Sequence, residues 1–348
     1  MISLAFRRCR FIASLVSVLA LTLVFVHLCS SGGQQAGLMR SLPDIYQKPL
    51  SLEDIKSYSD YLLSKIQHGA TRPAKPAPTQ PHLAMPTTDN PTGAIVAAVG
   101  MNTNLTWITE IKNPMWKLHR YNHDDPNPPP STHFPINKGN EAMAYLSYVI
   151  NNYESLPDYS IFIHGHRLSW HQEGDMVDII NNFRLPALIK AGYAPLRCDW
   201  YPSCPQEIRP IHHDAVVWGP GVHREDTEWV IAYVWKALFG PDEELPETIA
   251  SQCCAQFAVT RSAIQSRSKW EYERMRQWLV ETYLINDVSG RVFEKLWAYI
   301  FTKESVRCPP PQQCACEFFG QCSRKNWFIP PPGLARWPQE IDEYYIQS

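Results

Sequence analysis

The chain has 348 residues, of which 45% are hydrophobic and 12% aromatic, a composition typical of a globular protein. Its formal net charge is -2 and its lysines and arginines form no long run, so we expect no nucleic-acid partner, because phosphate binding needs clustered cations. The length suits one large domain with appended segments.

An uncharged apolar run over residues 11–29 follows three arginines, Arg7, Arg8 and Arg10. An apolar helix needs about 17–25 residues to cross a bilayer, so this run predicts a transmembrane signal anchor. The preceding cations predict that residues 1–10 are cytoplasmic and that the chain beyond is translocated. We therefore expect a single-pass type II membrane protein of the secretory pathway, in the Golgi, ER or cell surface. A cleaved signal peptide is the alternative.

Residues 30–92 are rich in Pro and poor in large apolar residues over their second half, which predicts a stem that tethers the domain. The globular domain is expected over residues 93–302. Beyond it, residues 303–348 form a tail rich in Cys and Pro.

The domain opens with the apolar run "GAIVAAVG" at 93–100, which predicts a strand buried on both faces. Apolar residues spaced at three and four predict a helix over 140–153, with Asn140 as its N-cap. "YSIFIHG" at 159–165 then predicts a second buried strand. Strand, helix and strand in this order form the unit of a parallel α/β sheet.

The later elements continue this alternation, so the predicted fold is α/β with a mostly parallel central sheet flanked by helices. These later elements begin with a helical stretch over 175–190 that is broken at Pro186, followed by a strand at 215–219. A helix capped by Asp226 or Thr227 then runs to Gly240, and a strand at 255–260 and helices at 268–284 and 290–301 follow it.

Eight cysteines lie in the expected translocated domain and tail, where an oxidising compartment favours disulfides. We expect Cys198 and Cys204 to pair across a small loop, and adjacent Cys253 and Cys254 not to pair with each other. The tail spacing predicts two disulfides, with a zinc site as the alternative. "NLT" at 104–106 is an N-glycosylation sequon.

The blocks "NKGNEAMAYLSYVINNYESLPDYSIFIHGH", "CCAQFAVTRSAIQSRSKWEYERMRQWL" and "FEKLWAYIFT" carry a family resemblance. In this order they resemble the largely fungal family catalogued as domain of unknown function 3431. The likeness covers about residues 93–302. That pattern usually has an Arg between Gly and Glu, where this sequence has Asn140.

The block order is also similar to that of GT-A-type glycosyltransferases, which use nucleotide sugars. That likeness implies a single GT-A-like domain, preceded here by an anchor and a Pro-rich stem. Its implied ligands are a nucleotide sugar, a divalent metal such as Mn or Zn, and a carbohydrate or glycoprotein substrate. GT-A enzymes hold the metal with Asp-x-Asp, and the sequence contains no Asp-x-Asp.

His164-Gly165-His166 stands at the corresponding strand end, with His171 close by in the sequence. Residues two apart in an extended chain point the same way, so both imidazoles can face one ligand. We therefore expect His164 and His166 to be catalytic, and His164, His166 and His171 to be metal ligands. A structural loop after a buried strand is the alternative interpretation.

Asn137, Lys138, Gly139 and Glu141 surround the expected helix start, where the helix dipole favours negative charge. We expect Asn137, Lys138 and Gly139 to bind a nucleotide, and Glu141 to be catalytic. The alternative interpretation is that Glu141 only stabilises the helix end. Aromatic candidates for stacking on sugar rings are Trp170, Trp200, Tyr201 and Trp218.

Three functions follow from these patterns. The first is a membrane-tethered, glycosyltransferase-like enzyme. The second is a non-catalytic luminal or cell-surface binding module with the same fold, favoured by the missing Asp-x-Asp and by Asn140. The third is a metal hydrolase centred on the histidines.

Overall fold

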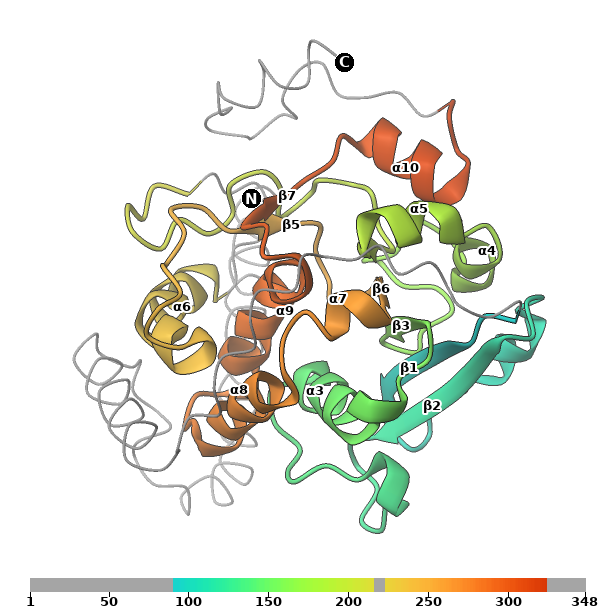
Figure 1. Cartoon of the computed structure of the whole chain (residues 1–348), viewed down its shortest axis with the longest axis horizontal. Helices are drawn as coiled ribbons and strands as arrows, with labels where there is room; N and C mark the ends of the chain where they lie inside the picture. Colours follow the sequence, from blue (N-terminus) through green and yellow to red (C-terminus); the bar gives the residue numbers. More distant parts are fainter. Residues whose placement is uncertain (1–89, 216–222, 324–348) are drawn as a thin grey trace, which may run out of the picture. The chain divides into compact units, whose positions relative to one another are not determined.

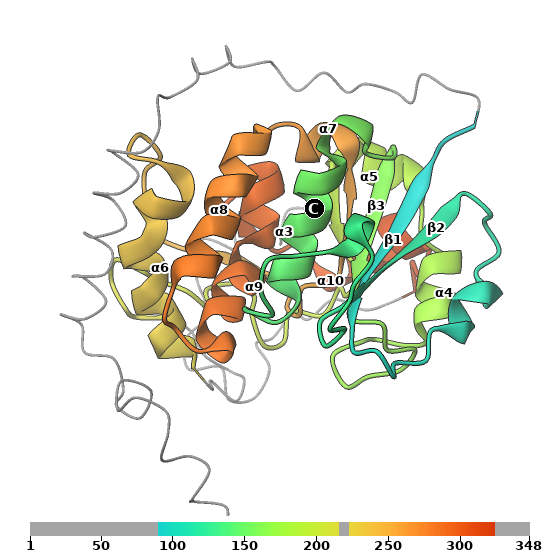
Figure 2. The ribbon, with the colours of Figure 1, turned by 90° about the horizontal axis from the view of Figure 1, so that it is seen from below.

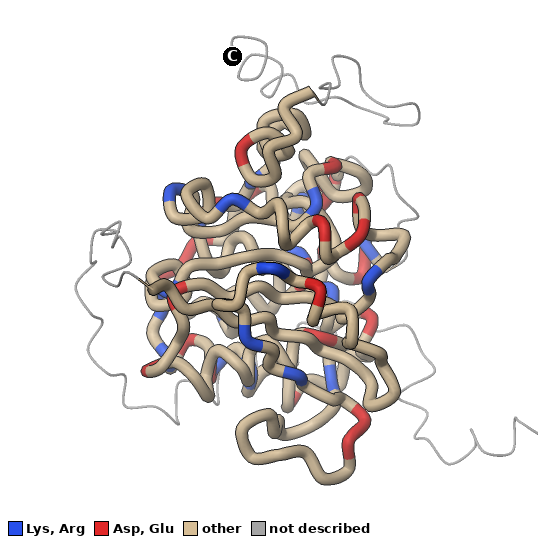
Figure 3. Tube along the Cα trace, turned by 90° about the vertical axis from the view of Figure 1, so that its right-hand side faces the viewer, with Lys and Arg blue, Asp and Glu red and all other residues tan. Residues whose placement is uncertain are grey.

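The structure is a computed structural model that describes residues 90–215 and 223–323 (Figure 1). The predicted anchor at 11–29, the stem, and most of the predicted strand at 215–219 lie outside these residues. Within them, no helix is both long and apolar enough to cross a membrane. Charged residues of both signs are interspersed along the trace rather than gathered in blocks (Figure 3).

A five-stranded sheet in the order β2-β1-β3-β6-β4 forms the centre of the fold. Its strands are β1 (Gly93–Val99), β2 (Trp116–Asn122), β3 (Tyr159–Ile163), β6 (Phe257–Thr260) and β4 (Tyr193–Pro195). β2, β1 and β3 run parallel, whereas β6 is antiparallel to both β3 and β4. The α/β prediction is confirmed, with the refinement that the mostly parallel sheet is mixed.

Side chains alternate across the sheet, and a different helical layer covers each face. On one face, Ile161 and Ile163 of β3 join a core that includes residues of α4 (Met176–Asn181), α5 (Leu185–Ala191) and α10 (Pro311–Phe319). On the other, Phe162 packs edge-on against Tyr145 of α3 (Glu141–Asn152). The aromatic side chains of α9 (Asn286–Thr302) complete that face.

Two further long helices lie outside α3 and α9. α8 (Lys269–Glu281) packs on α3, and α6 (Arg224–Phe239) packs on α8 and α9 (Figure 2). Ser268 and Glu271 form a capping box at the start of α8, satisfying backbone donors that a helix end otherwise leaves open. α9 is therefore enclosed between the sheet and α6, which explains why almost its whole circumference is buried.

The helices differ from the predicted bounds in identifiable ways. The stretch at 175–190 forms two helices, and the break precedes Pro186, which sits in the first turn of α5 as proline favours. α6 begins at Arg224, earlier than predicted. The short elements are α7 (Arg261–Ile264), β5 (Ala250–Ser251), β7 (Val306–Arg307), and the 3-10 turns at Thr106–Glu110, Pro130–Thr132 and Tyr153–Ser155.

Disulfides attach the segment after residue 302 to the domain. Cys198 pairs with Cys314 and Cys204 with Cys308, while Cys316 pairs with Cys322. The expectation of disulfides is confirmed, but the Cys198–Cys204 pairing was wrong, and the tail cysteines hold no zinc site because all are paired. α10 packs beside α5 and contributes Phe318 to the core, so packed structure continues beyond residue 302.

Adjacent Cys253 and Cys254 form a disulfide with each other, contrary to expectation. The backbone accommodates it with left-handed conformations at Cys254 (φ 87°) and Ala255 (φ 47°). This segment leads directly into β6, so the pair sits where the chain enters the central sheet.

Candidate functional site

The connections of the sheet reverse direction between β1 and β3. From β1 the chain moves outward to β2, and then crosses through α3 to β3 on the other side of β1. In open α/β sheets, ligands bind outside the carboxyl ends of the strands at such a switch point. Two cavities lie at this edge, and the loop that follows β3 contributes to both.

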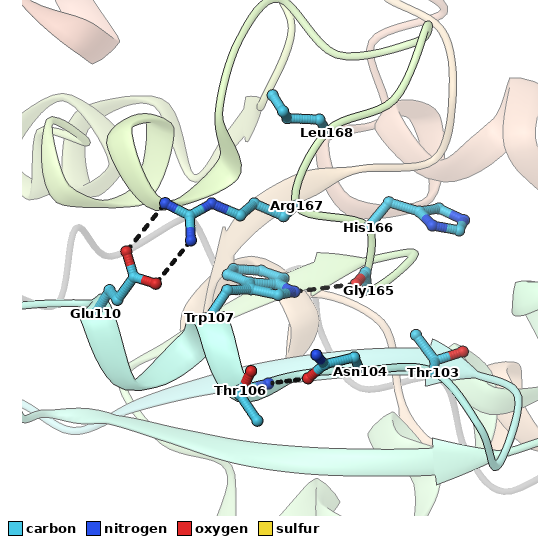
Figure 4. Close-up of a pocket in the computed structure, with 9 residues that line it drawn as sticks. All are labelled: Thr103, Asn104, Thr106, Trp107, Glu110, Gly165, His166, Arg167 and Leu168. Carbon is cyan, nitrogen blue, oxygen red and sulfur yellow. Dashed lines mark hydrogen bonds and ion pairs between the residues drawn. The ribbon is translucent and has the colours of Figure 1, made fainter.

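The first, which we call the loop cavity, has a volume of about 430 Å³ and lies between the loops that follow β1 and β3 (Figure 4). Its lining residues are Thr103, Asn104, Thr106, Trp107, Glu110, Gly165, His166, Arg167 and Leu168. Gly165 adopts φ +77°, and an added Cβ would lie 2.3 Å from Cγ1 of Val99, so only glycine fits there.

The polar groups of the loop cavity are largely engaged with one another. The Arg167 guanidinium donates to both carboxylate oxygens of Glu110, at 2.6 and 2.9 Å, and to Asp175 at 2.8 Å. The Trp107 indole donates to the carbonyl of Gly165 (Figure 4). These contacts hold the two loops together, so the loop cavity offers a ligand few unsatisfied groups despite its size.

The second, the helix cavity, has a volume of about 300 Å³ and brings together the start of α3, the end of β3 and one side of α9. Its lining residues are Asn140, Glu141, His164, Trp170, His171, Pro202, Glu207, Arg224, Cys253, Cys254, Asp287, Gly290, Arg291, Glu294 and Lys295. Seven of these are Asp, Glu, Arg or Lys, so ionisable chemistry gathers here rather than in the larger cavity.

α9 approaches the start of α3 closely because Gly290 has no side chain. A Cβ at Gly290 would lie 2.9 Å from both the carbonyl oxygen of Gly139 and the side-chain nitrogen of Asn140. Asn286 of α9 accepts a hydrogen bond from the Gly139 amide at 3.1 Å. Asn140 precedes α3 with φ 53° and forms no side-chain cap, which corrects its predicted capping role.

Glu141, the first residue of α3, has a strongly perturbed carboxyl. Burial raises the pKa of Glu141 to about 8, and the negative charge of Glu294 adds to this effect, while the Arg291 charge opposes it. Despite its own burial, Glu294 has a lowered pKa because of Lys295, whose ammonium lies 2.9 Å away. Two carboxyls in one cavity are thus driven to opposite protonation states, as in acid–base sites.

Lys295 is itself almost fully enclosed. It pairs with Glu207 at 3.0 Å as well as with Glu294, and it donates to the Ser203 hydroxyl at 3.3 Å. Both neighbouring carboxylates raise the pKa of Lys295 against the effect of burial. The Lys295 ammonium therefore holds the carboxylates of Glu207 and Glu294 in place.

His164, at the end of β3, lies with its Nδ1 3.1 Å from Nε2 of His171. Burial is the main reason that the pKa of His164 falls to about 3, so the ring is neutral at physiological pH. Gln256 accepts a hydrogen bond from the His164 amide, which ties the strand end to the segment after the Cys253–Cys254 disulfide. The other ring nitrogen of His164, Nε2, is buried without a hydrogen-bond partner.

Trp170 projects at the rim of the helix cavity, and 77% of its surface is exposed. It contacts His171 edge-on at 5.1 Å. Nδ1 of His171 lies 3.0 Å from the Ser169 hydroxyl, so the ring that contacts the exposed indole is itself hydrogen-bonded. Pro202 and the Cys253–Cys254 disulfide add apolar surface to the same cavity.

The residues predicted from the sequence separate in space. Glu141, His164 and His171 line the helix cavity, whereas His166 lines the loop cavity. Asn137, Lys138 and Gly139 line neither of these two cavities. Lys138 donates to the Thr282 carbonyl at the end of α8. Nucleotide binding by residues 137–139 therefore stays a prediction, with Lys138 serving as a structural contact in this arrangement.

The metal site also stays a prediction. Across residues 90–215 and 223–323, no three His, Cys, Asp or Glu side chains are grouped so that they could hold a metal ion. The facing nitrogens of His164 and His171 contact each other rather than a shared centre, and the rings of His166 and His171 lie 6.3 Å apart.

Sequence reasoning missed the contribution of α9 to the site. The helix at 290–301 was predicted, but Asp287, Arg291 and Glu294 were not named as site residues. The available signal was their spacing of four and three, which places them along one side of the helix. Arg224 and Glu207 carried no comparable signal.

Comparison with known proteins gives one match. The model of the family described as "Protein of unknown function (DUF3431)" matches residues 95–317. The match thus includes three tail cysteines, which the sequence resemblance had left out. No curated protein and no solved structure matches the chain.

Proposed function

The chain belongs to the family of proteins of unknown function DUF3431, and we propose that it is a glycosyltransferase-like enzyme that uses a nucleotide sugar in the helix cavity. The observation that carries the proposal is the Glu141–Glu294 pair. One carboxyl has a pKa of about 8 and the other is held ionised, inside one cavity at the carboxyl end of β3. Strongly perturbed, charge-coupled groups in a cavity are typical of acid–base sites.

Glu141 is the general base of the proposed reaction. Sugar transfer to an acceptor requires a group that takes the proton of the attacking hydroxyl, and a base is most effective when its pKa lies near the working pH. The acceptor oxygen bonds to the anomeric carbon as the bond from that carbon to the donor diphosphate breaks. The electron pair leaves with the diphosphate, and the hydroxyl proton passes to the Glu141 carboxylate.

Glu294 has a different role because Lys295 keeps it ionised. A carboxylate with a lowered pKa is a weak base, but it maintains negative charge beside Glu141 and so keeps that group basic. It also accepts hydrogen bonds well. We therefore assign Glu294 to orienting the acceptor and tuning Glu141.

Trp170 supports a carbohydrate as the acceptor. A large aromatic face exposed at a cavity rim offers apolar contact to a ring, while carboxylates and the Asn140 amide offer partners for hydroxyl groups. Substituting Trp170 with Ala is expected to raise KM for the acceptor while leaving donor binding unchanged.

The proposal includes the expected topology, in which the domain lies in the secretory pathway behind an N-terminal anchor. Four disulfides within the described residues support an oxidising compartment. Expression of the full chain with a protease-protection assay in microsomes would test this orientation.

The enzymatic proposal is tested by thermal shift and turnover. The full chain, purified from a secretory host, is titrated with UDP- and GDP-sugars, with and without manganese or zinc, and donor hydrolysis or transfer is then measured. We expect nucleotide-sugar stabilisation in the wild type and in Glu141→Gln, with turnover lost only in Glu141→Gln. Binding without any turnover would favour a non-catalytic module, and the absence of both would refute the proposal.

A further inference from the structure

One cation in the helix cavity has no partner. Among the described residues, the guanidinium of Arg291 forms no hydrogen bond and no ion pair, although its charge is near enough to lower the pKa of both Glu141 and Glu294. A guanidinium offers five N–H donors and is rarely left unengaged in a partly enclosed position.

The other arginines and lysines that line the two cavities are held by hydrogen bonds and ion pairs. Arg224 pairs with Glu228 at 2.9 Å and donates to the Glu207 carbonyl, and Lys295 pairs with Glu207 and Glu294. In the loop cavity, Arg167 is held by Glu110 and Asp175. Arg197, after β4, also has an unpartnered Nε, but it lines neither cavity. Among the described cations that line the two cavities, Arg291 is thus the one whose donors form no contact.

None of the described carboxyls of the cavity forms an ion pair with Arg291. Glu207 and Glu294 share Lys295, and Glu141 retains its proton through neutral pH because burial raises its pKa. Asp287 lies one helical turn before Arg291 but forms no ion pair with it. Among the described residues, Arg291 therefore stands in the cavity without a direct ion pair, so its donors can reach a ligand.

A second unsatisfied group belongs to another residue that lines the helix cavity. Nε2 of His164 is buried without a partner, although His164 lines the helix cavity. When His171 donates its proton to Nδ1 of His164, the remaining His164 proton is on Nε2 and is free to be donated. A buried donor left unpaired costs free energy, which a ligand oxygen would recover.

From these two groups we infer that Arg291 and His164 form a phosphoryl-binding subsite, which takes the diphosphate of the donor without a metal. Guanidinium binds phosphate oxygens in a bidentate manner, and a neutral imidazole adds one directed hydrogen bond. The volume of about 300 Å³ accommodates a diphosphate with part of a sugar. This inference rests on the proposed function.

The subsite supplies what bond cleavage requires. As the bond between the anomeric carbon and the diphosphate oxygen breaks, negative charge builds on the diphosphate, and a fixed cation stabilises that charge more in the transition state than in the ground state. Arg291 therefore serves the leaving group, while Glu141 serves the acceptor. Their placement in one cavity gives the two halves of a transfer reaction.

The experiment is isothermal titration calorimetry of the full chain with inorganic pyrophosphate and with UDP, in EDTA and then with manganese. The variants are Arg291→Gln, Arg291→Lys, and Arg167→Gln as the matched control from the loop cavity. Glucuronate is titrated in parallel to separate phosphoryl from carboxylate recognition. Circular dichroism melts confirm that each variant folds.

We expect pyrophosphate to bind the wild type in EDTA, and its affinity to fall at least tenfold in Arg291→Gln. The affinity should recover in part in Arg291→Lys and should equal that of the wild type in Arg167→Gln. Binding that needs manganese, or that is equal in Arg291→Gln and wild type, overturns the inference. So does preference for glucuronate. If nucleotide sugars still stabilise Arg291→Gln as they do the wild type, only this subsite is wrong; if no nucleotide ligand binds the wild type, the proposed function fails as well.

Discussion

Nδ1 of His164 lies 3.1 Å from Nε2 of His171, which joins the end of β3 to the loop that carries the exposed Trp170. Both rings have a lowered pKa, chiefly through burial, and each would raise the cost of a positive charge on the other. The pair is thus a neutral hydrogen-bonded unit, and acid should disturb it.

Acid stability should depend on His164. The pKa of His164 is about 3 in the folded protein, against an ordinary value of 6.5. Between these two pH values the imidazole is protonated in the unfolded chain but stays neutral in the folded one. Stability is therefore lost as the pH falls from 6.5 towards 3. We expect His164→Asn to show a shallower acid loss in urea-unfolding measurements. The exposed His133→Asn should keep the wild-type slope, and identical slopes in all three proteins would contradict this account.

Glu141 should give the opposite pH dependence. Its folded pKa of about 8 exceeds the ordinary 4.5, so its contribution to stability is complete below pH 4.5 and declines as the pH rises through 8. Glu141→Gln cannot ionise, so we expect its melting temperature to exceed that of the wild type by a margin that grows between pH 4.5 and 8 and is constant above.

The same substitution should lower turnover by about 10²- to 10⁴-fold, the usual contribution of a general base. In the wild type, kcat/KM should rise with pH, reach half its maximum near pH 8 and level off above it, because Glu141 acts in its ionised form. The control is Glu154→Gln, at an exposed position after α3. Its melting temperature and turnover rate should equal those of the wild type at each pH. A pH–rate profile that is flat between pH 6 and 9 would remove Glu141 from the base role.

The two long-range disulfides should act non-additively. Cys198–Cys314 and Cys204–Cys308 close loops of similar length, with sequence separations of 116 and 104. While one disulfide is intact, the other closes only a small loop made of residues 198–204 and 308–314. Replacing either pair with Ser should therefore lower the free energy of unfolding by about 3 kcal/mol. Removing the second should cost about 4.7 kcal/mol more, as for a loop of about 100 residues. Guanidinium titrations measure both steps; equal costs would show that the loops are independent.

Asn104 should carry an N-linked glycan if the domain is translocated. Its side chain is exposed in the loop after β1, and its Oδ1 accepts a hydrogen bond from the Thr106 amide at 2.9 Å (Figure 4). We expect a mobility shift on treatment with peptide N-glycosidase that is lost in Asn104→Gln and Thr106→Ala but retained in Thr106→Ser. No shift in protein from a secretory host would count against translocation.

Strong local signals made most of the sheet and helices predictable. The run Ile95–Val96–Ala97 is apolar on both faces, and β1 is buried on both. β2 was missed because "WKLHRYN" lies at the sheet edge and is only partly buried, so its pattern resembles a loop. β4 was missed because three residues are too short for any periodicity.

The site was predictable only where it adjoins a recognised element. Glu141 and His164 flank α3 and β3, and both line the helix cavity. Arg291 and Glu294 come from a helix more than a hundred residues later, and nothing local indicates that α9 crosses the start of α3 at Gly290. The separation of His166 from His164 follows from the left-handed Gly165 between them, which ends the extended alternation that the prediction assumed.

The position of β6 has a consequence for incomplete chains. It inserts between β3 and β4 although it follows them by some sixty residues or more, so "YSIFI" has a free edge until residues 257–260 arrive. An apolar edge strand with open backbone groups is a template for pairing with other chains. Premature termination between residues 163 and 257 should therefore yield aggregating fragments rather than smaller folded domains, whereas cleavage after residue 323 spares the sheet.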